Sequence, residues 1–159
     1  MSNSRDVPFE TTLHVRDACL CLHAQRAART LSRIFDEAFH PVGITSGQFS
    51  LLNALNRPVP PKVGAVAQLL AMDRTTLTAA LKPLERDGLI AVTVDPDDRR
   101  GRLLHLTEAG QKVLASAVPI WRDLHAAIEA DLPALDPDAL RSALNHLARS
   151  KPPRESVLP

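Results

Sequence analysis

Apolar residues recur every three or four positions near both ends of the chain, which is the spacing of one face of an α-helix. The first such stretch runs from Val15 to Phe39, and Pro41 ends it because proline disfavours helical backbone at the preceding residue. A second stretch follows Thr107, which can cap it, and a third spans residues 138–149. We therefore expect long helices at the two ends of the chain.

The middle of the chain predicts two helices joined by a tight turn, after one further helix. Thr45 or Ser46 can cap that preceding helix. A short apolar helix is expected over residues 63–71, and Asp73 is a suitable N-cap for a longer helix over residues 74–87. The last two helices and the turn between them form a helix-turn-helix.

The longer helix carries one stripe of apolar side chains and two residues that affect its backbone. Gly88 is the expected C′ residue, while Pro83 removes one backbone hydrogen bond and should bend the axis. The inward stripe consists of Leu77, Leu81 and Leu84.

A β-hairpin is predicted directly after this helix. Residues 89–94 alternate apolar and β-branched positions, residues 95–101 form a polar turn, and residues 102–106 form the return strand. The expected fold class is therefore mainly α with a small β-hairpin wing, that is, a winged helix-turn-helix flanked by N- and C-terminal helices.

Composition limits the function in three respects. The 159 residues suit one domain, and the 45% apolar content is enough for a real core. The net charge of +1 argues against a bulk polycation, so nucleic-acid binding would depend on local clusters of charge. Residues 1–15 lack the apolar run of a signal peptide and no run reaches the ~20 residues of a membrane span, so we expect a cytoplasmic protein without a membrane partner.

The helix over residues 74–87 offers side chains suited to DNA. Arginine matches guanine, lysine meets phosphates, and threonine offers a hydroxyl and a methyl group. Threonine is a mediocre helix former, so three threonines in one and a half turns call for an explanation. The candidate DNA-binding residues here are Arg74, Thr75, Thr76, Thr78 and Lys82. The alternative is a solvated helix face.

The predicted hairpin turn is rich in arginine. Three arginines at a loop tip repel one another, and insertion into the negative minor groove is one reason to place them there. The candidate DNA-binding residues of this loop are Arg99, Arg100 and Arg102. The alternative is a charged turn that keeps the hairpin soluble.

Residues 98–107, DRRGRLLHLT, resemble the wing signature of the multiple antibiotic resistance regulator (MarR) family. The matching positions are Asp98, Arg100, Gly101, Leu106 and Thr107. The stretches GITSGQFSLLNAL, MDRTTLTAALKPLERDGLI and TEAGQKVL are similar to the family's second helix, its recognition helix with the following strand, and the start of its long dimerisation helix. The resemblance covers roughly residues 15–148, and Pro83 departs from the usual recognition helix.

The resemblance implies a single domain over residues 13–149, with the winged helix-turn-helix at about 44–107 and dimerisation helices at about 15–40 and 107–149. Residues 1–12 and 150–159 are expected to be a flexible arm and tail.

The function that the resemblance implies is that of a homodimeric regulator, usually a repressor. It would bind a pseudo-palindromic double-stranded operator and release it when a small ligand or an oxidant acts. Arg100 would enter the minor groove, and Asp98 would position Arg100 by a charge-assisted hydrogen bond. A winged-helix module that binds protein instead of DNA is the alternative from another class.

A small effector, often an aromatic acid or phenol in this family, would bind between the dimerisation helices and the DNA-binding lobe. Its candidate lining residues are Arg16, His23, Phe49 and Trp121, each of which also has a plain core or surface interpretation.

Cys21 resembles in position the peroxide-reactive cysteine of one branch of the family, and the alternative is a buried structural cysteine. Cys19 lies two residues earlier in a stretch that looks helical, so a disulfide between the two is not expected.

Enzymatic and metal sites are not indicated. No acidic cluster joins His14 and His23, which also lack i, i+4 spacing, so no metal site is expected. No nucleophile–base motif, phosphate-binding loop or dinucleotide-binding motif is present, so neither an enzyme nor a cofactor is expected.

Overall fold

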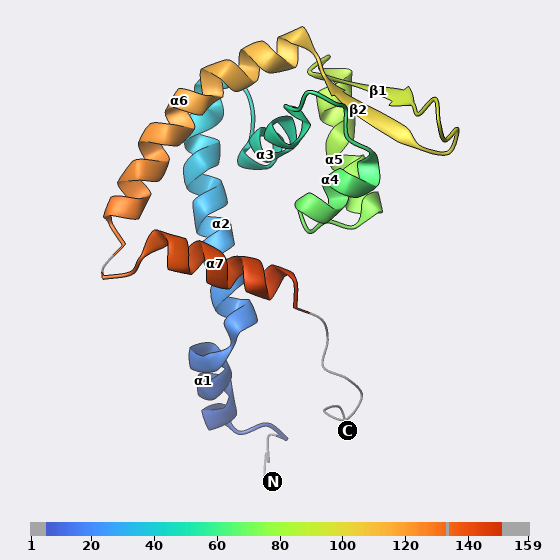
Figure 1. Cartoon of the computed structure of the whole chain (residues 1–159). Coiled ribbons are helices and arrows are strands. Elements are labelled where there is room, and N and C mark those ends of the chain that lie inside the picture. The colour runs from blue at the N-terminus through green and yellow to red at the C-terminus, as the bar shows by residue number, and fades with distance from the viewer. Residues whose placement is uncertain (1–5, 133, 151–159) are drawn as a thin grey trace.

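The structure, a computed structural model, describes residues 6–132 and 134–150. The elements are α1 (Phe9–Ala18), α2 (Leu20–Phe39), a 3-10 turn η1 (His40–Val42), α3 (Ser46–Leu55), α4 (Val63–Leu69), α5 (Arg74–Arg86), β1 (Ile90–Val94), β2 (Arg102–Leu106), α6 (Glu108–Ala130) and α7 (Pro137–Ala148). In Figure 1 the helices labelled α3, α4 and α5 lie with the β1–β2 hairpin in one lobe on the right, and the long helices α2 and α6 lie on the left. The predicted fold class, mainly α with a hairpin wing after a helix-turn-helix, is confirmed.

Polar side chains start the helices of the lobe at the predicted places. Thr45, and not Ser46, caps α3: its hydroxyl accepts the N–H of Gln48 at 3.2 Å, and the Gln48 side chain accepts the N–H of Thr45 at 2.9 Å. Asp73 caps α5 by accepting the N–H of Thr76 at 2.8 Å. The turn between α4 and α5 is therefore fixed by local hydrogen bonds.

The end of α5 and the start of α6 meet at the base of the hairpin. Gly88 follows α5 with φ of 72°, as expected for a C′ glycine. Thr107 caps α6 by accepting the N–H of Gly110 at 3.0 Å, and its hydroxyl donates to the Gly88 carbonyl at 2.7 Å. One threonine thus ties the hairpin base to both helices.

The core lies where α3, α4, α5, the hairpin and α6 meet the end of α2. Leu77, Leu81 and Leu84 are all buried, which confirms the predicted inward stripe of α5. Full burial of a leucine side chain contributes about 1.5–3 kcal/mol. The largest fully buried side chains are Phe39, Leu52, Val66, Leu77, Leu84 and Leu104. Pro83 lies inside α5, and the helix continues past it to Arg86.

The hairpin is a two-stranded antiparallel sheet. Ile90 pairs with Leu106 at its base, and Val94 pairs with Arg102 next to the loop. The segment before α4 extends this sheet, because the Leu104 N–H donates to the Pro61 carbonyl at 3.0 Å and Lys62 bridges to Leu103. The wing is thereby attached to the start of the helix-turn-helix.

The N-terminal region differs from the expected single helix. A helix begins at Phe9, so residues 9–12, which were expected to belong to the N-terminal arm, are helical. The chain then leaves helical geometry at Cys19, with φ of −76° and ψ of 105°. Helical geometry was the reason for not expecting a Cys19–Cys21 disulfide, and that premise is wrong, although both thiols are free in this structure.

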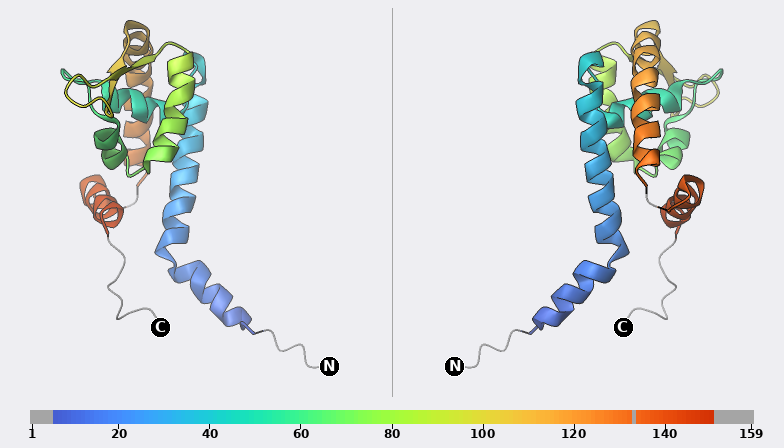
Figure 2. Two further views of the ribbon diagram at one scale, coloured as in Figure 1. Left: turned by 90° about the vertical axis from the view of Figure 1, so that its right-hand side faces the viewer. Right: turned by 90° about the vertical axis from the view of Figure 1, so that its left-hand side faces the viewer.

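Helices α1 and α7 contribute no buried residue. In Figure 1, α7 crosses in front of α2, but the turned views of Figure 2 show the two helices apart. Arg141 of α7 pairs with Glu129 of α6 and with Asp138. Within the described residues no helix is both long and apolar enough to cross a membrane. The expected tail lies outside the described residues except for Ser150.

Candidate nucleic-acid interface

Four of the five candidate residues on α5 border one exposed hollow on the surface of the lobe. They are Arg74, Thr75, Thr78 and Lys82, joined by Ala79. Arg74 extends across α4, where a side-chain carbon on Gly64 would lie only 3.0 Å from its guanidinium group. The hydroxyl of Thr78 forms a hydrogen bond within the helix, because it donates to the Arg74 carbonyl at 2.7 Å.

Thr76, the fifth candidate on α5, serves the cap of the helix. Its hydroxyl donates to the Asp73 carboxylate at 2.5 Å, and its N–H donates to the same carboxylate. These two hydrogen bonds stabilise the charged carboxylate and lower the pKa of Asp73 from its ordinary value. The structure therefore gives Thr76 a structural task at the start of the recognition helix.

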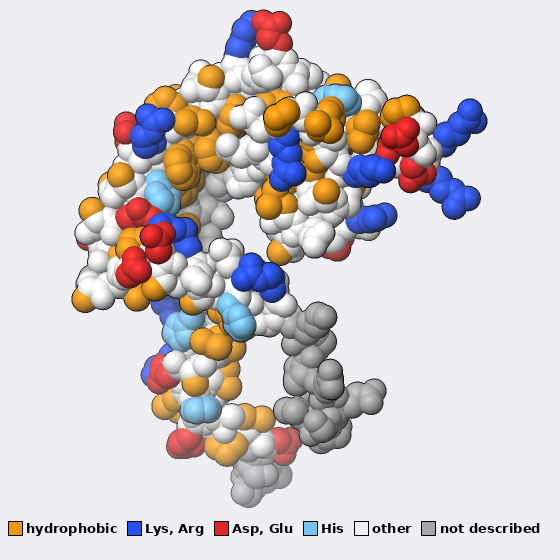
Figure 3. Space-filling view, viewed as in Figure 1, with side chains coloured by type: hydrophobic (Ala, Val, Ile, Leu, Met, Phe, Trp, Pro, Cys, Tyr) orange, Lys and Arg blue, Asp and Glu red, His pale blue; other side chains and the backbone are white. Residues whose placement is uncertain are grey.

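Arg99 and Arg100 are exposed at the tip of the wing. Figure 3 shows basic side chains projecting from this edge of the lobe, with acidic side chains beside them. Among the ion pairs of the described residues, none involves Arg99 or Arg100. Arg102 differs, because its guanidinium donates to the carbonyls of Arg99 at 3.2 Å and Gly101 at 3.0 Å. Two arginines project, and the third shapes the loop.

The resemblance implied that Asp98 binds the guanidinium group of Arg100, but the structure shows a different contact. The Asp98 carboxylate accepts the backbone N–H of Arg100 at 3.0 Å. An aspartate readily makes this hydrogen bond to the residue two positions on, and the result is a tight turn. Asp98 therefore directs Arg100 through the path of the backbone.

The sequence did not reveal that the loop is built on Asp95, which is 3% exposed. One carboxylate oxygen accepts the Asp97 N–H at 3.0 Å, and the other lies 2.6 Å from the Lys62 ammonium group. The lysine and the Asp97 N–H lower the pKa of Asp95, and Asp95 raises the pKa of Lys62. The one signal in the sequence was a lysine at the position before α4, where a capping side chain is usual.

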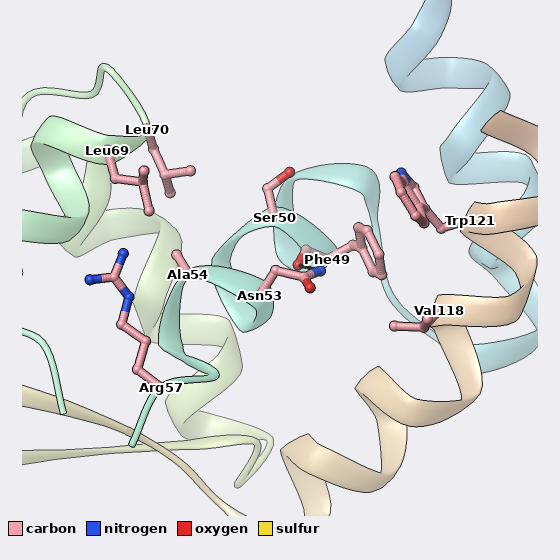
Figure 4. A pocket seen from close by; sticks show the side chains of 9 residues that line it. All are labelled: Phe49, Ser50, Asn53, Ala54, Arg57, Leu69, Leu70, Val118 and Trp121. Atoms are coloured by element: carbon pink, nitrogen blue, oxygen red, sulfur yellow. Dashed lines mark hydrogen bonds between the residues drawn. The ribbon is translucent and has the colours of Figure 1, made fainter. Parts of the chain in front are cut away.

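A cavity of about 470 Å³, open to solvent, lies between α3, α4 and α6 (Figure 4). Its walls come from α3, α4, α6 and the residue Arg57 that follows α3. The lining residues are Phe49, Ser50, Asn53, Ala54, Arg57, Leu69, Leu70, Val118 and Trp121. This volume is in the range of small-molecule sites.

The cavity brings together two of the four candidate effector residues. The rings of Phe49 and Trp121 lie 6.4 Å apart, and Trp121 also stacks on His125 at 4.9 Å. Arg16 and His23 are not among the lining residues: Arg16 pairs with Asp17, and the His23 ring contacts the Asp17 carbonyl. The cation in the lining is instead Arg57, which the sequence did not single out.

Cys21 is exposed, and the Gln25 side-chain amide donates to its sulfur at 3.3 Å. The interpretation of Cys21 as a buried cysteine therefore does not hold for the single chain. No group of three or more metal-binding side chains occurs among the described residues.

A helix-turn-helix with a basic wing beside it defines a winged-helix DNA-binding protein. A family model described as MarR family matches residues 42–101. The M. tuberculosis regulator MosR, solved in complex with DNA, is 34% identical, with a TM-score of 0.75 over 82% of this chain and 93% of that chain. The repressor CouR, bound to a 23-mer DNA duplex, is 32% identical, with a TM-score of 0.72 over 85% of this chain and 96% of that chain.

The protein belongs to the MarR family and is a transcriptional regulator of that type, with the family's DNA-binding winged helix. The family consists of regulators and not of enzymes. A curated relative, the transcriptional activatory protein BadR of Rhodopseudomonas palustris, is 36% identical over 91 residues, or 55% of this chain and 52% of BadR. The chain spans about half to two thirds of the length of the first curated relatives it matches.

Proposed function

We propose that this protein is a homodimeric repressor that binds a pseudo-palindromic operator and releases it when a small ligand fills the cavity beside α6. The observation that carries the proposal is the pair of exposed, unpaired arginines at the wing tip beside the exposed face of α5. The face of α5 would read the major groove, and Arg99 and Arg100 would reach the adjacent minor groove.

The test of the DNA contact is Arg100→Ala. One lost arginine contact should weaken operator binding roughly tenfold and reduce the salt dependence by about one counterion, while the melting temperature stays unchanged. The measurement is titration of the operator at several salt concentrations. Lys112→Ala is the control, because Lys112 is an exposed lysine that pairs with Glu108 at the start of α6. Equal affinity of the Arg100 variant and the parent at matched salt would exclude the wing contact.

The homodimer is supported by apolar side chains that the single chain leaves uncovered on its terminal helices. They are Phe9, Val15, Leu20, Leu144 and Leu147. Such surfaces on a monomer commonly mark an interface, and a two-fold dimer is the commonest arrangement. Two recognition helices in such a dimer would enter successive major grooves about 34 Å apart.

The cavity supports an aromatic or phenolic acid as the effector. Phe49 and Trp121 offer apolar ring faces, and Arg57 is the one cation among the lining residues. A ring would pack against the aromatic side chains, while its carboxylate would meet the guanidinium of Arg57.

We propose that the protein represses transcription and does not activate it. Among the similar proteins, CouR is a repressor and BadR an activator. A reporter gene placed behind the operator distinguishes repression from activation.

Control through Cys21 is a second candidate, favoured by the exposure of its thiol. An accessible thiol is open to oxidation to a sulfenic acid. If Cys21 is the sensor, organic hydroperoxide will release the parent protein from its operator and will leave Cys21→Ser bound, as measured by gel shift. Release of both proteins to the same extent would remove Cys21 from consideration, and Cys19→Ser serves as the matched variant.

A further inference from the structure

Asp95 is the one charged side chain that the described part of the chain withdraws from solvent. A buried carboxylate is costly unless a cation and hydrogen-bond donors compensate it. It also stands where the wing begins, directly after β1. A costly group at such a place requires a structural reason.

The hydrogen bonds around Asp95 close the base of the loop. Its N–H donates to the Gly101 carbonyl at 3.1 Å, and its carbonyl accepts the Asp98 N–H at 3.3 Å. Its carboxylate accepts the Asp97 N–H at 3.0 Å. A side-chain carbon on Gly101 would lie 3.1 Å from both the Asp95 Cβ and the Asp98 carbonyl oxygen, so the loop closes tightly against Asp95.

Lys62 supplies the compensating cation from another part of the chain. It immediately precedes α4 but gives that helix no side-chain cap. Its backbone bridges to Leu103 of β2, and its ammonium group lies 2.6 Å from the Asp95 carboxylate. The lysine side chain is 59% exposed and the aspartate side chain 4%, so the pair runs from the surface of the helix-turn-helix into the wing.

We propose that Lys62 and Asp95 form a positioning pair that holds the wing at a fixed place relative to the helix-turn-helix. The pair sets where Arg99 and Arg100 reach the DNA while α5 occupies the major groove. Lys62 is then a positioning residue and not a phosphate contact. The expected effect of the pair on operator affinity rests on the proposed function. Its expected effect on the order of the wing in the free protein does not.

The decisive experiment compares Lys62→Met with the double variant Lys62→Met/Asp95→Asn in the full chain. Lys62→Met leaves a buried charge unpaired, which should displace the wing and weaken operator binding roughly tenfold. Adding Asp95→Asn removes that charge and keeps an acceptor for the Asp97 N–H, so most of the lost affinity should return. If Lys62 instead contacts a DNA phosphate directly, the double variant should bind the operator no better than Lys62→Met. That result would overturn the proposal.

Two further variants complete the comparison. Lys62→Arg keeps the cation and should bind within about threefold of the parent protein, since arginine also pairs with carboxylates. Lys112→Met removes an exposed lysine that pairs with Glu108 on α6 and not with the wing loop, and it should leave affinity unchanged. Circular dichroism melting of every variant checks that the fold is intact.

Hydrogen exchange in the absence of DNA tests the pair independently of function. The amides of Asp97 and Gly101 donate within the loop, at 3.0 Å and 2.7 Å, so their protection reports on wing order. Lys62→Met should reduce the protection of both amides, and the double variant should restore it. Unchanged protection in Lys62→Met overturns the proposal. If the parent protein binds no operator, the proposed function fails while the exchange experiment still decides the role of the pair.

Discussion

Glycine occupies two positions at which the wing and its neighbouring helix pack too closely for a side chain. Gly101 faces Asp95, and Gly110 in the first turn of α6 faces the Leu89 carbonyl. A side-chain carbon on Gly110 would lie 2.1 Å from that oxygen, which no local adjustment of a flexible group relieves. The first turn of α6 is therefore in direct contact with the chain that enters the wing.

Replacement of Gly110 by alanine should destabilise the protein by about 1–3 kcal/mol, because the added carbon forces backbone apart in a packed region. Thermal denaturation should show a fall in melting temperature of roughly 2–10 °C. Gly47→Ala in α3 is the matched control, since a carbon there would have its nearest neighbour, the hydroxyl of the N-cap Thr45, at 3.9 Å. That variant should be neutral or slightly stabilised, because alanine is a better helix former than glycine. Equal melting temperatures of the two variants would contradict the proposed packing.

The roles of single residues could be predicted from the sequence where they depend on neighbouring residues in the chain. Caps act within a few residues, so the sequence was sufficient to identify Asp73 and Thr107 and to limit the first cap to Thr45 or Ser46, of which the structure shows Thr45. Asp95 gains its meaning only from Lys62, which the fold brings to it. The interruption of the helix at Cys19 could not be predicted, because no glycine or proline lies next to it in the sequence.

Helix α6 makes different contacts at its start, its middle and its end. Its start touches the wing base, its middle lines the cavity through Val118 and Trp121, and its end pairs with α7 through Glu129. The resemblance to the MarR family suggested Phe49 and Trp121 as lining residues, whereas the apolar periodicity predicted the helix itself. It missed Arg57, because a residue in a loop has no periodic pattern from which its direction can be read.

Trp121 is the single tryptophan of a chain without tyrosine, so its fluorescence reports on the cavity. Benzoate should change that emission saturably, and benzyl alcohol, the neutral analogue, should bind more weakly. Arg57→Ala should reduce benzoate affinity by roughly tenfold through loss of a charge-assisted hydrogen bond. Arg86→Ala, which alters an exposed arginine paired with Asp87, is the control. Equal benzoate affinity of both variants would exclude Arg57 as the acid-binding group.

In the whole molecule, apolar side chains of the terminal helices stay exposed on a single chain. Helix α7 buries no residue of its own, and Leu144 and Leu147 are 47% and 45% exposed. The periodic pattern predicted this helix well, but the sequence and a single chain cannot define the surface that covers it. A partner chain is the proposed cover.

Leu144→Glu should dissociate the proposed dimer, because a carboxylate in an apolar interface costs several kcal/mol unless it is neutralised. Sedimentation should then give the mass of one 17.3 kDa chain where the parent gives twice that value. Ser142→Glu adds the same charge at an exposed position two residues earlier, on the other side of the helix, and should leave the dimer intact. A Leu144→Glu protein that sediments like its parent would show that α7 lies outside the interface.

The attachment of α6 at its first turn has a geometric consequence. A helix of 23 residues is about 35 Å long, at ~1.5 Å per residue. If its start stays fixed against the wing base, a tilt of about 5° displaces its far end by about 3 Å over that length. That displacement is close to the ~3.4 Å rise of one base pair along the DNA axis. If a ligand in the cavity tilted α6 by that angle, the end of α6 that leads to α7 would move relative to the wing base by about the rise of one base pair.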